Sequence, residues 1–163
     1  MHNSQTSQPE EGTWPAVEPA YDFVVPSYQM LISRFEAADN RLTALVSVVS
    51  GLTLGGPAFA RAVNQTIAFD SPQFMFALVA AAVAAILGVV GRIQGRLVLP
   101  NPTIFYGVLH ESPWTFKKNA IYFAGQHFTK NARTIEVKGR YATAVTIVLL
   151  IQIWMLTIWF AAS

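Results

Sequence analysis

The stretch from Phe74 to Gly91, FMFALVAAAVAAILGVVG, contains no charged residue and decides the fold class of this chain. A helix that crosses the hydrocarbon core of a bilayer needs about 20 predominantly apolar residues. A soluble helix needs a polar face, which this stretch lacks. Because backbone groups in hydrocarbon must be hydrogen-bonded within their own segment, the sequence predicts a transmembrane helix at 74–91.

Two further stretches have the same character. One covers about 42–63 and is interrupted by three glycines and Pro57, and the other covers about 142–162 with Gln152 as its strongly polar residue. Only 12% of the 163 residues are charged, against about 25% in a typical soluble domain, and the mean hydropathy is +0.39. We therefore expect an all-α membrane protein with three transmembrane helices, and we exclude an ordinary soluble enzyme core.

The distribution of basic residues predicts the orientation in the membrane. Eight of the eleven Lys and Arg residues lie in the loop between the second and third spans, 92–141, and the loop at 64–73 has none. By the positive-inside rule, the long loop and the N-terminus are cytoplasmic and the C-terminus lies on the opposite side. The net charge of +2 is too small to indicate a nucleic acid polymer as a partner.

Outside the spans we expect one polar tail and three shorter helical segments. Residues 1–19 are rich in Ser, Gln, Pro and Glu, which is typical of a disordered tail. The remaining chain, 20–163, is interpreted as a single multi-span domain. An amphipathic helix is expected from Ser27, which follows Pro26 and can serve as its N-cap, and it continues into the first span. In the cytoplasmic loop we expect a helix after Ser112-Pro113 to about 123, and a second from about 129 into the third span.

The sequence offers little for catalysis. It has no cysteine, and it contains no phosphate-binding loop, zinc-protease motif or nucleophile elbow. His110 and His127 are the histidines of the loop, and two histidines so far apart with a single neighbouring acid indicate no metal site. We therefore expect neither an enzyme nor a cofactor.

Basic and aromatic residues alternate in the cytoplasmic loop. Cations bind phosphate and flat rings stack on bases, so this loop has the groups that an anionic, base-bearing ligand needs. Binding of the same basic residues to anionic lipid headgroups is the alternative that composition alone favours. The candidate ligand-binding residues are Trp114, Lys117, Lys118, Tyr122, Lys130 and Arg133.

Small and charged residues suggest how the spans pack. The first span has the pair Gly51 and Gly55, and the second has alanines and glycines at four-residue spacing, so both can approach a neighbouring helix closely, within the chain or in another copy. Asp39 and Arg41 stand just before the first span. They mark the cytoplasmic boundary, which is the favoured interpretation, or Asp39 pairs with Lys138 or Arg140 at the start of the third span; the two interpretations are compatible.

Three short motifs resemble a known family. Residues 38–45, ADNRLTAL, lead into a glycine-containing span, Asn101-Pro102 begins an NPxxFxG motif after the second span, and KGRY at 138–141 opens the third. In order and spacing these motifs are similar to those of the transmembrane effectors of Pycsar anti-phage systems. The resemblance covers the chain from about residue 28 to its end, with Asn40-Arg41 in place of the commoner Lys-Ala. Its boundary motif residues here are Asp39, Arg41, Asn101, Lys138 and Arg140.

The resemblance implies a function in bacterial defence. In that family a partner cyclase makes a cyclic pyrimidine nucleotide, cUMP or cCMP, and the effector impairs the inner membrane so that the infected cell dies. It implies for this chain a multi-pass protein of the bacterial inner membrane, in contact with membrane lipids. With the orientation from the positive-inside rule the C-terminus is periplasmic, and the small-residue faces of the spans lead us to expect a homo-oligomer. The alternative function is a small structural or accessory membrane subunit that docks a protein partner or anionic lipid.

Overall fold

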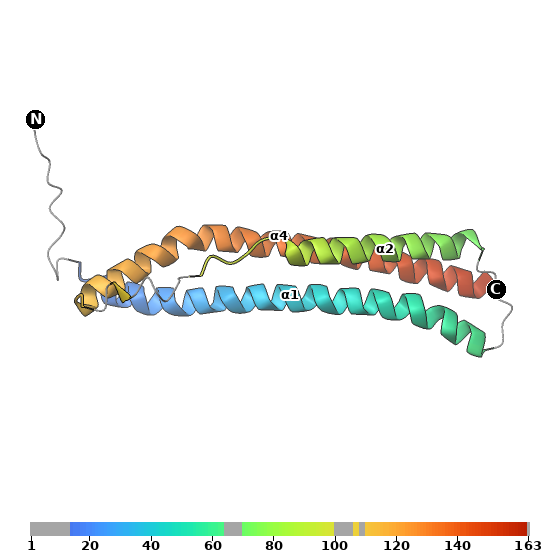
Figure 1. The fold of residues 1–163 in the computed structure, drawn as a ribbon, viewed down its shortest axis with the longest axis horizontal. Coiled ribbons are helices and arrows are strands. Elements are labelled where there is room, and N and C mark those ends of the chain that lie inside the picture. Colours follow the sequence, from blue (N-terminus) through green and yellow to red (C-terminus); the bar gives the residue numbers. More distant parts are fainter. Residues whose placement is uncertain (1–13, 64–69, 100–105, 108–109, 163) are drawn as a thin grey trace, which may run out of the picture. The chain divides into compact units, whose positions relative to one another are not determined.

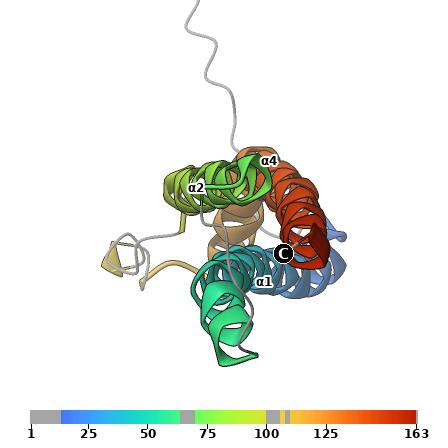
Figure 2. The ribbon, with the colours of Figure 1, turned by 90° about the vertical axis from the view of Figure 1, so that its right-hand side faces the viewer.

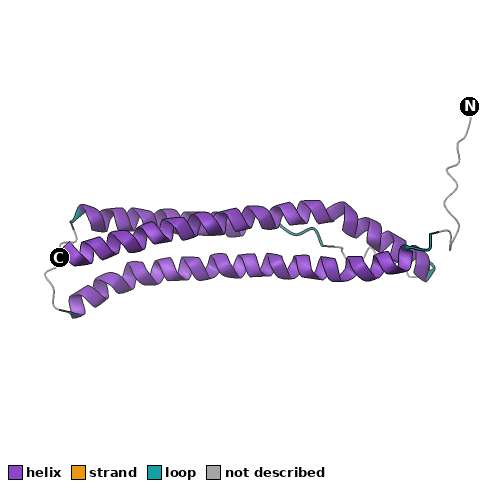
Figure 3. Ribbon diagram, turned by 180° about the vertical axis from the view of Figure 1, so that it is seen from behind, coloured by secondary structure: helices purple, strands orange, loops and turns teal. Residues whose placement is uncertain are grey.

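A computed structural model of the chain describes residues 14–63, 70–99, 106–107 and 110–162. Its helices are α1 (Val17–Ala62), α2 (Pro72–Ile93) and α4 (Pro113–Ala162), drawn in Figure 1 and coloured by secondary structure in Figure 3. Within the described residues, these three helices are all long and apolar enough to cross a membrane. The all-α membrane architecture is thus confirmed, and the expected spans at 42–63, 74–91 and 142–162 fall almost entirely within these helices.

Two helices begin where the sequence predicts. At α2 the hydroxyl of Ser71 accepts a hydrogen bond from the amide of Phe74 at 3.3 Å, with Pro72 as the first helical residue. At α4 the hydroxyl of Ser112 accepts from the amide of Thr115 at 3.2 Å. In both cases a serine satisfies an amide that has no partner within the helix, and the proline after it has no amide to satisfy.

The start of α1 differs from the prediction. The helix begins at Val17, so the disordered tail does not extend to residue 19 and Ser27 is not an N-cap. Instead the Ser27 hydroxyl donates to the carbonyl of Phe23 at 2.8 Å, one turn earlier in the same helix. Val17 and Leu31 are almost fully buried on either side of Pro26. Tertiary packing of this segment therefore outweighs the local signal of a proline, which removes a single helical hydrogen bond.

The predicted break in the cytoplasmic loop is absent. α4 is one helix of 50 residues, where we expected a helix ending near 123 and a second beginning near 129. Ala124 and Asn131 lie buried within this region, so packing keeps it helical across Gly125. The part of the expected cytoplasmic loop from 113 to 141 accordingly belongs to α4.

The chain forms two compact units. Unit 1 combines residues up to Ser33 with Leu97–Ala132, and unit 2 combines Arg34–Arg96 with Arg133–Ser163. In unit 2, seen end-on in Figure 2, α1, α2 and α4 lie around a common core. That core receives apolar residues from all three helices: Leu42, Val49, Ala81, Ala84, Ala142, Val145 and Leu149.

The small residues of α2 are used inside the chain. A Cβ atom on Gly88 would lie 2.3 Å from Cγ2 of Val46, and one on Gly91 would lie 2.6 Å from Cβ of Tyr141. Glycine at these two positions lets α2 approach α1 and α4 closely. In α1, by contrast, a Cβ on Gly51 or Gly55 would meet no atom within 4 Å.

The C-terminus of α2 depends on a glycine. The amide of Gln94 donates to the carbonyl of Val90 at 2.9 Å, and Gly95 then takes a φ of +80°. This left-handed conformation is the usual way to end a helix and favours glycine strongly. A Cβ on Gly95 would also lie 2.3 Å from Cγ2 of Thr134.

We predict that Gly95→Ala lowers the free energy of unfolding of the detergent-solubilised protein by at least about 1 kcal/mol, because alanine is strained at positive φ and collides with Thr134. Thermal unfolding followed by circular dichroism measures the effect. The matched control is Gly125→Ala in α4, where the added Cβ meets nothing within 4 Å; there alanine should be neutral or stabilising. Equal midpoints for the two variants would contradict the prediction.

Candidate functional site

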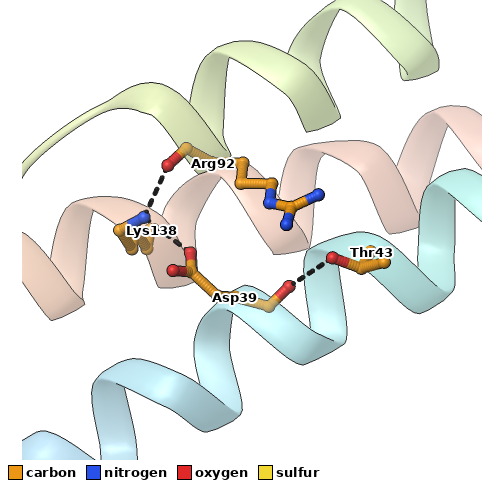
Figure 4. Close-up of polar contacts among 4 residues, drawn as sticks. All are labelled: Asp39, Thr43, Arg92 and Lys138. Atoms are coloured by element: carbon orange, nitrogen blue, oxygen red, sulfur yellow. Dashed lines mark hydrogen bonds and ion pairs between the residues drawn. The ribbon is translucent and has the colours of Figure 1, made fainter.

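A buried charge joins the three helices of unit 2. The side chain of Lys138 in α4 has no solvent exposure. Its Nζ donates to Oδ1 of Asp39 in α1 at 2.6 Å and to the backbone carbonyl of Arg92 in α2 at 2.8 Å, as Figure 4 shows. The same Nζ lies 4.6 Å from the ring centroid of Phe35. We call Lys138, Asp39 and the Arg92 carbonyl the charge node.

Each partner in the charge node offsets part of the cost of burying an ammonium group. Asp39 supplies a full negative charge, and the Phe35 ring presents its electron-rich face. Arg92 is in the last turn of α2, where carbonyls lack helical partners and the helix dipole is negative. Removing one member of such a pair leaves a buried charge without compensation, which costs about 3–5 kcal/mol.

The charge node accounts for part of the boundary motif. The alternative interpretation, in which Asp39 pairs with a basic residue of the third span, is confirmed for Lys138 and is wrong for Arg140. Arg140 instead forms an exposed ion pair with Glu136 at 2.7 Å, one turn earlier in α4. Arg41 is exposed, and Asn101 lies outside the described residues.

A second polar contact lies deeper in the core of unit 2. Gln152, 1% exposed, donates from Nε2 to Oγ1 of Thr53 at 2.9 Å and thereby links α4 to α1. The hydroxyl of Thr53 is itself bonded to the carbonyl of Val49 at 2.7 Å. Gln152 was visible in the sequence as a polar interruption of the third span, but its partner was not.

Unit 1 is held by a buried asparagine that the sequence analysis missed. Asn131 in α4 has no exposed surface; its Oδ1 accepts from the amide of Val98 at 2.9 Å and its Nδ2 donates to the Val98 carbonyl at 3.1 Å. The hydroxyl of Tyr28 also donates to that carbonyl. Burial raises the pKa of Tyr28 above its ordinary value of 10.0, and the hydrogen bond with Asn131 lowers it by a smaller amount. The phenol therefore keeps the proton that it donates to the Val98 carbonyl. A single asparagine in a polar segment of the sequence did not indicate that Asn131 would be buried and hydrogen-bonded to Val98 and Tyr28.

A pocket opens between the starts of α1 and α4 in unit 1. Its volume is about 480 Å³. Aromatic and aliphatic side chains form most of the wall, and Lys118 is its cationic group. The lining residues are Trp14, Ala16, Val17, Ala20, Lys118, Asn119, Ile121 and Tyr122.

The structure brings four of the six candidate ligand-binding residues to one part of α4. Lys118 and Tyr122 line the pocket. The Lys118 ammonium lies 5.2 Å from the ring centroid of Trp114, whose indole in turn packs edge-on against Trp14. The indole Nε1 of Trp114 is buried without a hydrogen-bond partner among the described residues. Lys117 is engaged elsewhere, in an ion pair with Glu18 and 5.5 Å from the ring centroid of Tyr21.

The other two candidates are not part of this group. Lys130 is on the same helix twelve residues beyond Lys118, which corresponds to about 18 Å along the axis. Arg133 belongs to unit 2. Among the described residues, no group of three or more His, Cys, Asp or Glu side chains could hold a metal ion.

Comparisons with family models, with curated proteins and with solved structures returned no match.

We predict that Asp39→Asn lowers the free energy of unfolding by about 3–5 kcal/mol, since it leaves the fully buried Lys138 ammonium uncompensated. Lys138→Met should cost less, because the Asp39 side chain that it leaves unpaired is 29% exposed and stays partly hydrated. The double variant should recover a large part of that loss, because neither charge remains. Chemical unfolding of the purified protein in detergent measures all three variants. Arg140→Gln is the control: it breaks an exposed pair and should change stability by less than about 0.5 kcal/mol. Additive effects of the two single substitutions would show that the pair is not coupled.

Proposed function

We propose that this chain is a membrane effector of a bacterial anti-phage system. A cyclic pyrimidine nucleotide, cUMP or cCMP, binds unit 1, and the protein then impairs the inner membrane and causes abortive infection. The observation that carries the proposal is the pocket of unit 1, where aromatic rings and a lysine occur together in a chain whose three helices are long and apolar enough to cross a membrane.

The pocket has the size and the chemistry for a mononucleotide. Small-molecule sites have volumes of about 300–1,000 Å³, and this pocket falls in that range at about 480 Å³. Trp14 and Tyr122 are 49% and 72% exposed and can stack on a base. Lys118 supplies a cation for the phosphate. Because Lys130 is about 18 Å along the helix from Lys118, it cannot bind the same phosphate. We therefore propose as ligand contacts only the residues around Trp114 and Lys118.

The proposed topology follows from the charges of the segments between helices. Of the basic residues of the expected cytoplasmic loop, unit 1 contains Lys117, Lys118 and Lys130. We place unit 1 in the cytoplasm together with the N-terminus, so that the C-terminus is periplasmic. A nucleotide made in the cytoplasm would then reach the pocket directly. This placement is supported by the absence of Lys and Arg from the connection between α1 and α2.

Activation requires that the nucleotide bind one arrangement of the protein better than another. α1 and α4 each contribute residues to both units, so a ligand that bridges their starts in unit 1 acts on the same two helices that the charge node joins in unit 2. Oligomerisation through the open glycine face of α1 would then let several copies form a membrane lesion.

We predict that Lys117→Glu with Lys118→Glu abolishes toxicity and leaves membrane insertion intact, because the pocket loses its cationic group, Lys118, and the negative charge added at and beside the pocket repels the phosphate. The measurement is membrane potential, by a voltage-sensitive dye, in bacteria that express the chain with an active or an inactive pyrimidine cyclase. The wild type should depolarise the cell only with the active enzyme.

The matched control is Lys130→Glu with Arg133→Glu, which changes the net charge equally but lies away from the pocket. Normal killing by the Lys117 and Lys118 variant would remove the pocket from the mechanism. If the wild type is in the membrane, nucleotide is present and the potential stays normal, the effector proposal fails.

We predict that Gly51→Leu with Gly55→Leu reduces the size of the detergent-solubilised oligomer, because bulky side chains prevent close approach of two α1 helices. Inside one chain these positions are open, so folding of the monomer should be preserved. Cross-linking in membranes and light scattering of the purified protein report the size. An unchanged oligomer, or a monomeric wild type, would exclude this face as an interface.

One observation favours the alternative, a small accessory membrane subunit. Most of the pocket wall is apolar, with Ala16, Val17, Ala20 and Ile121 beside the two aromatic rings, and an apolar segment of a partner protein would fit such a wall. This alternative requires neither toxicity nor a response to nucleotide, so the membrane-potential measurement separates the two functions.

A further inference from the structure

A narrow groove lies between α1 and α2 in unit 2. Its volume is about 110 Å³, well below the roughly 300 Å³ of a site that encloses a whole small molecule. It can therefore hold a segment of an elongated ligand. Leu42, Thr43, Val46 and Ser47 line it from α1, and Gly88, Val89 and Arg92 line it from α2.

Arg92 stands at one end of this groove and has two separate roles. Its carbonyl accepts the hydrogen bond from Lys138, and its guanidinium extends away from that bond along α2 in Figure 4. Among the described residues, no carboxylate forms an ion pair with this guanidinium, because Asp39 is engaged by Lys138. The groove therefore ends in an exposed, uncompensated cation whose backbone is fixed by the charge node.

The rest of the groove suits a hydrocarbon chain. Val46 packs over Gly88, and Val46 and Val89 present methyl groups to the groove. The hydroxyls of Thr43 and Ser47 donate to carbonyls of their own helix, at 3.0 Å to Asp39 and 3.0 Å to Thr43. An apolar chain can cover these two hydroxyls without leaving a donor unsatisfied, so covering them avoids the usual penalty for burying a polar group.

We propose that this groove binds an anionic phospholipid of the surrounding leaflet, with its phosphate on the Arg92 guanidinium and part of an acyl chain along Val89 and Ser47. A phospholipid joins a phosphate to hydrocarbon, and the groove offers a cation directly followed by apolar surface. Arg92 comes immediately after the uncharged stretch that ends at Gly91, at the depth where headgroups meet a transmembrane helix. The proposal rests on the membrane placement of the chain and not on activation by a nucleotide.

The test compares lipid binding by four variants of the full-length protein purified in detergent. Native mass spectrometry counts bound phosphatidylglycerol and phosphatidylcholine at equal concentrations. The wild type should prefer phosphatidylglycerol by about fivefold, the factor that one arginine near an anionic lipid supplies. Arg92→Gln should remove the preference, and Ser47→Leu, which fills the groove, should lower the binding of both lipids.

Two control variants make the test specific. Arg140→Gln removes an exposed arginine that is already paired with Glu136, and Ser50→Leu adds the same bulk to an exposed position of α1 outside the groove. Neither should change lipid binding, and inorganic phosphate should not displace the lipid. Equal binding of the two lipids by the wild type, or equal losses in the controls, would overturn the proposal.

Two further results would also overturn it. A change of oligomeric mass in Ser47→Leu alone would show that a second copy of the chain occupies the groove. Loss of the preference in Arg92→Gln with normal binding in Ser47→Leu would show that the arginine acts without the groove. The lipid preference is measured without nucleotide, so its failure is distinct from failure of the proposed effector function.

Discussion

The buried ammonium of Lys138 is the constraint on which the packing of unit 2 depends. A charge without solvent contact must find compensation inside the protein, and here three sources supply it: Asp39 from α1, the Arg92 carbonyl from α2 and the ring of Phe35. Because the partners come from different helices, the ion pair fixes how α1, α2 and α4 meet at this level as well as holding them together. An apolar residue at position 138 could fill the same space. It would, however, remain favourably buried even if one helix shifted by a turn along another. The ammonium would lose its hydrogen bonds in a shifted arrangement. The cost of burying it without partners therefore selects one register of the three helices.

The small residues of α2 make that register possible. Arg92 can offer its carbonyl to Lys138 only because Gly88 and Gly91, one turn and one residue before it, allow α2 to lie against Val46 and Tyr141. The left-handed Gly95 then turns the chain away immediately after the node. In hydrocarbon, where helix association gains little from apolar burial, close van der Waals contact and a few polar contacts supply the remaining specificity. The Gln152–Thr53 hydrogen bond is a second polar contact, deeper in the same core.

Hydropathy and capping residues predicted most of this fold, and the errors have a common origin. The uncharged stretches and the Ser71-Pro72 and Ser112-Pro113 starts are local signals that no tertiary contact opposes. Pro26 is also a local signal, but the burial of Val17 and Leu31 on either side of it overrides this signal and α1 continues. The contact between Asp39 and Lys138 could be proposed from charge alone, although the choice of Lys138 over Arg140 depends on the helix face. Asn131 could not be found, because its partners are the backbone of Val98 and the phenol of Tyr28, and backbone groups carry no sequence pattern.

The contacts of Lys117 bear on how a ligand could change the state of unit 1. A nucleotide shifts an equilibrium only by the difference between its affinities for two arrangements. Lys117 is paired with Glu18, so it contributes to a phosphate site only in an arrangement in which that pair has opened. Lys118 lies over the Trp114 ring and needs no such exchange. Under the proposed function, a phosphate held first by Lys118 would gain Lys117 as a second cation when Glu18 is released from α4. The free energy by which the ligand favours the opened arrangement would equal that of the additional contact minus the cost of breaking the exposed ion pair. Breaking such a pair costs about 0–1 kcal/mol. Under the proposed function, the ligand selects the opened arrangement when the additional contact is stronger than this small cost.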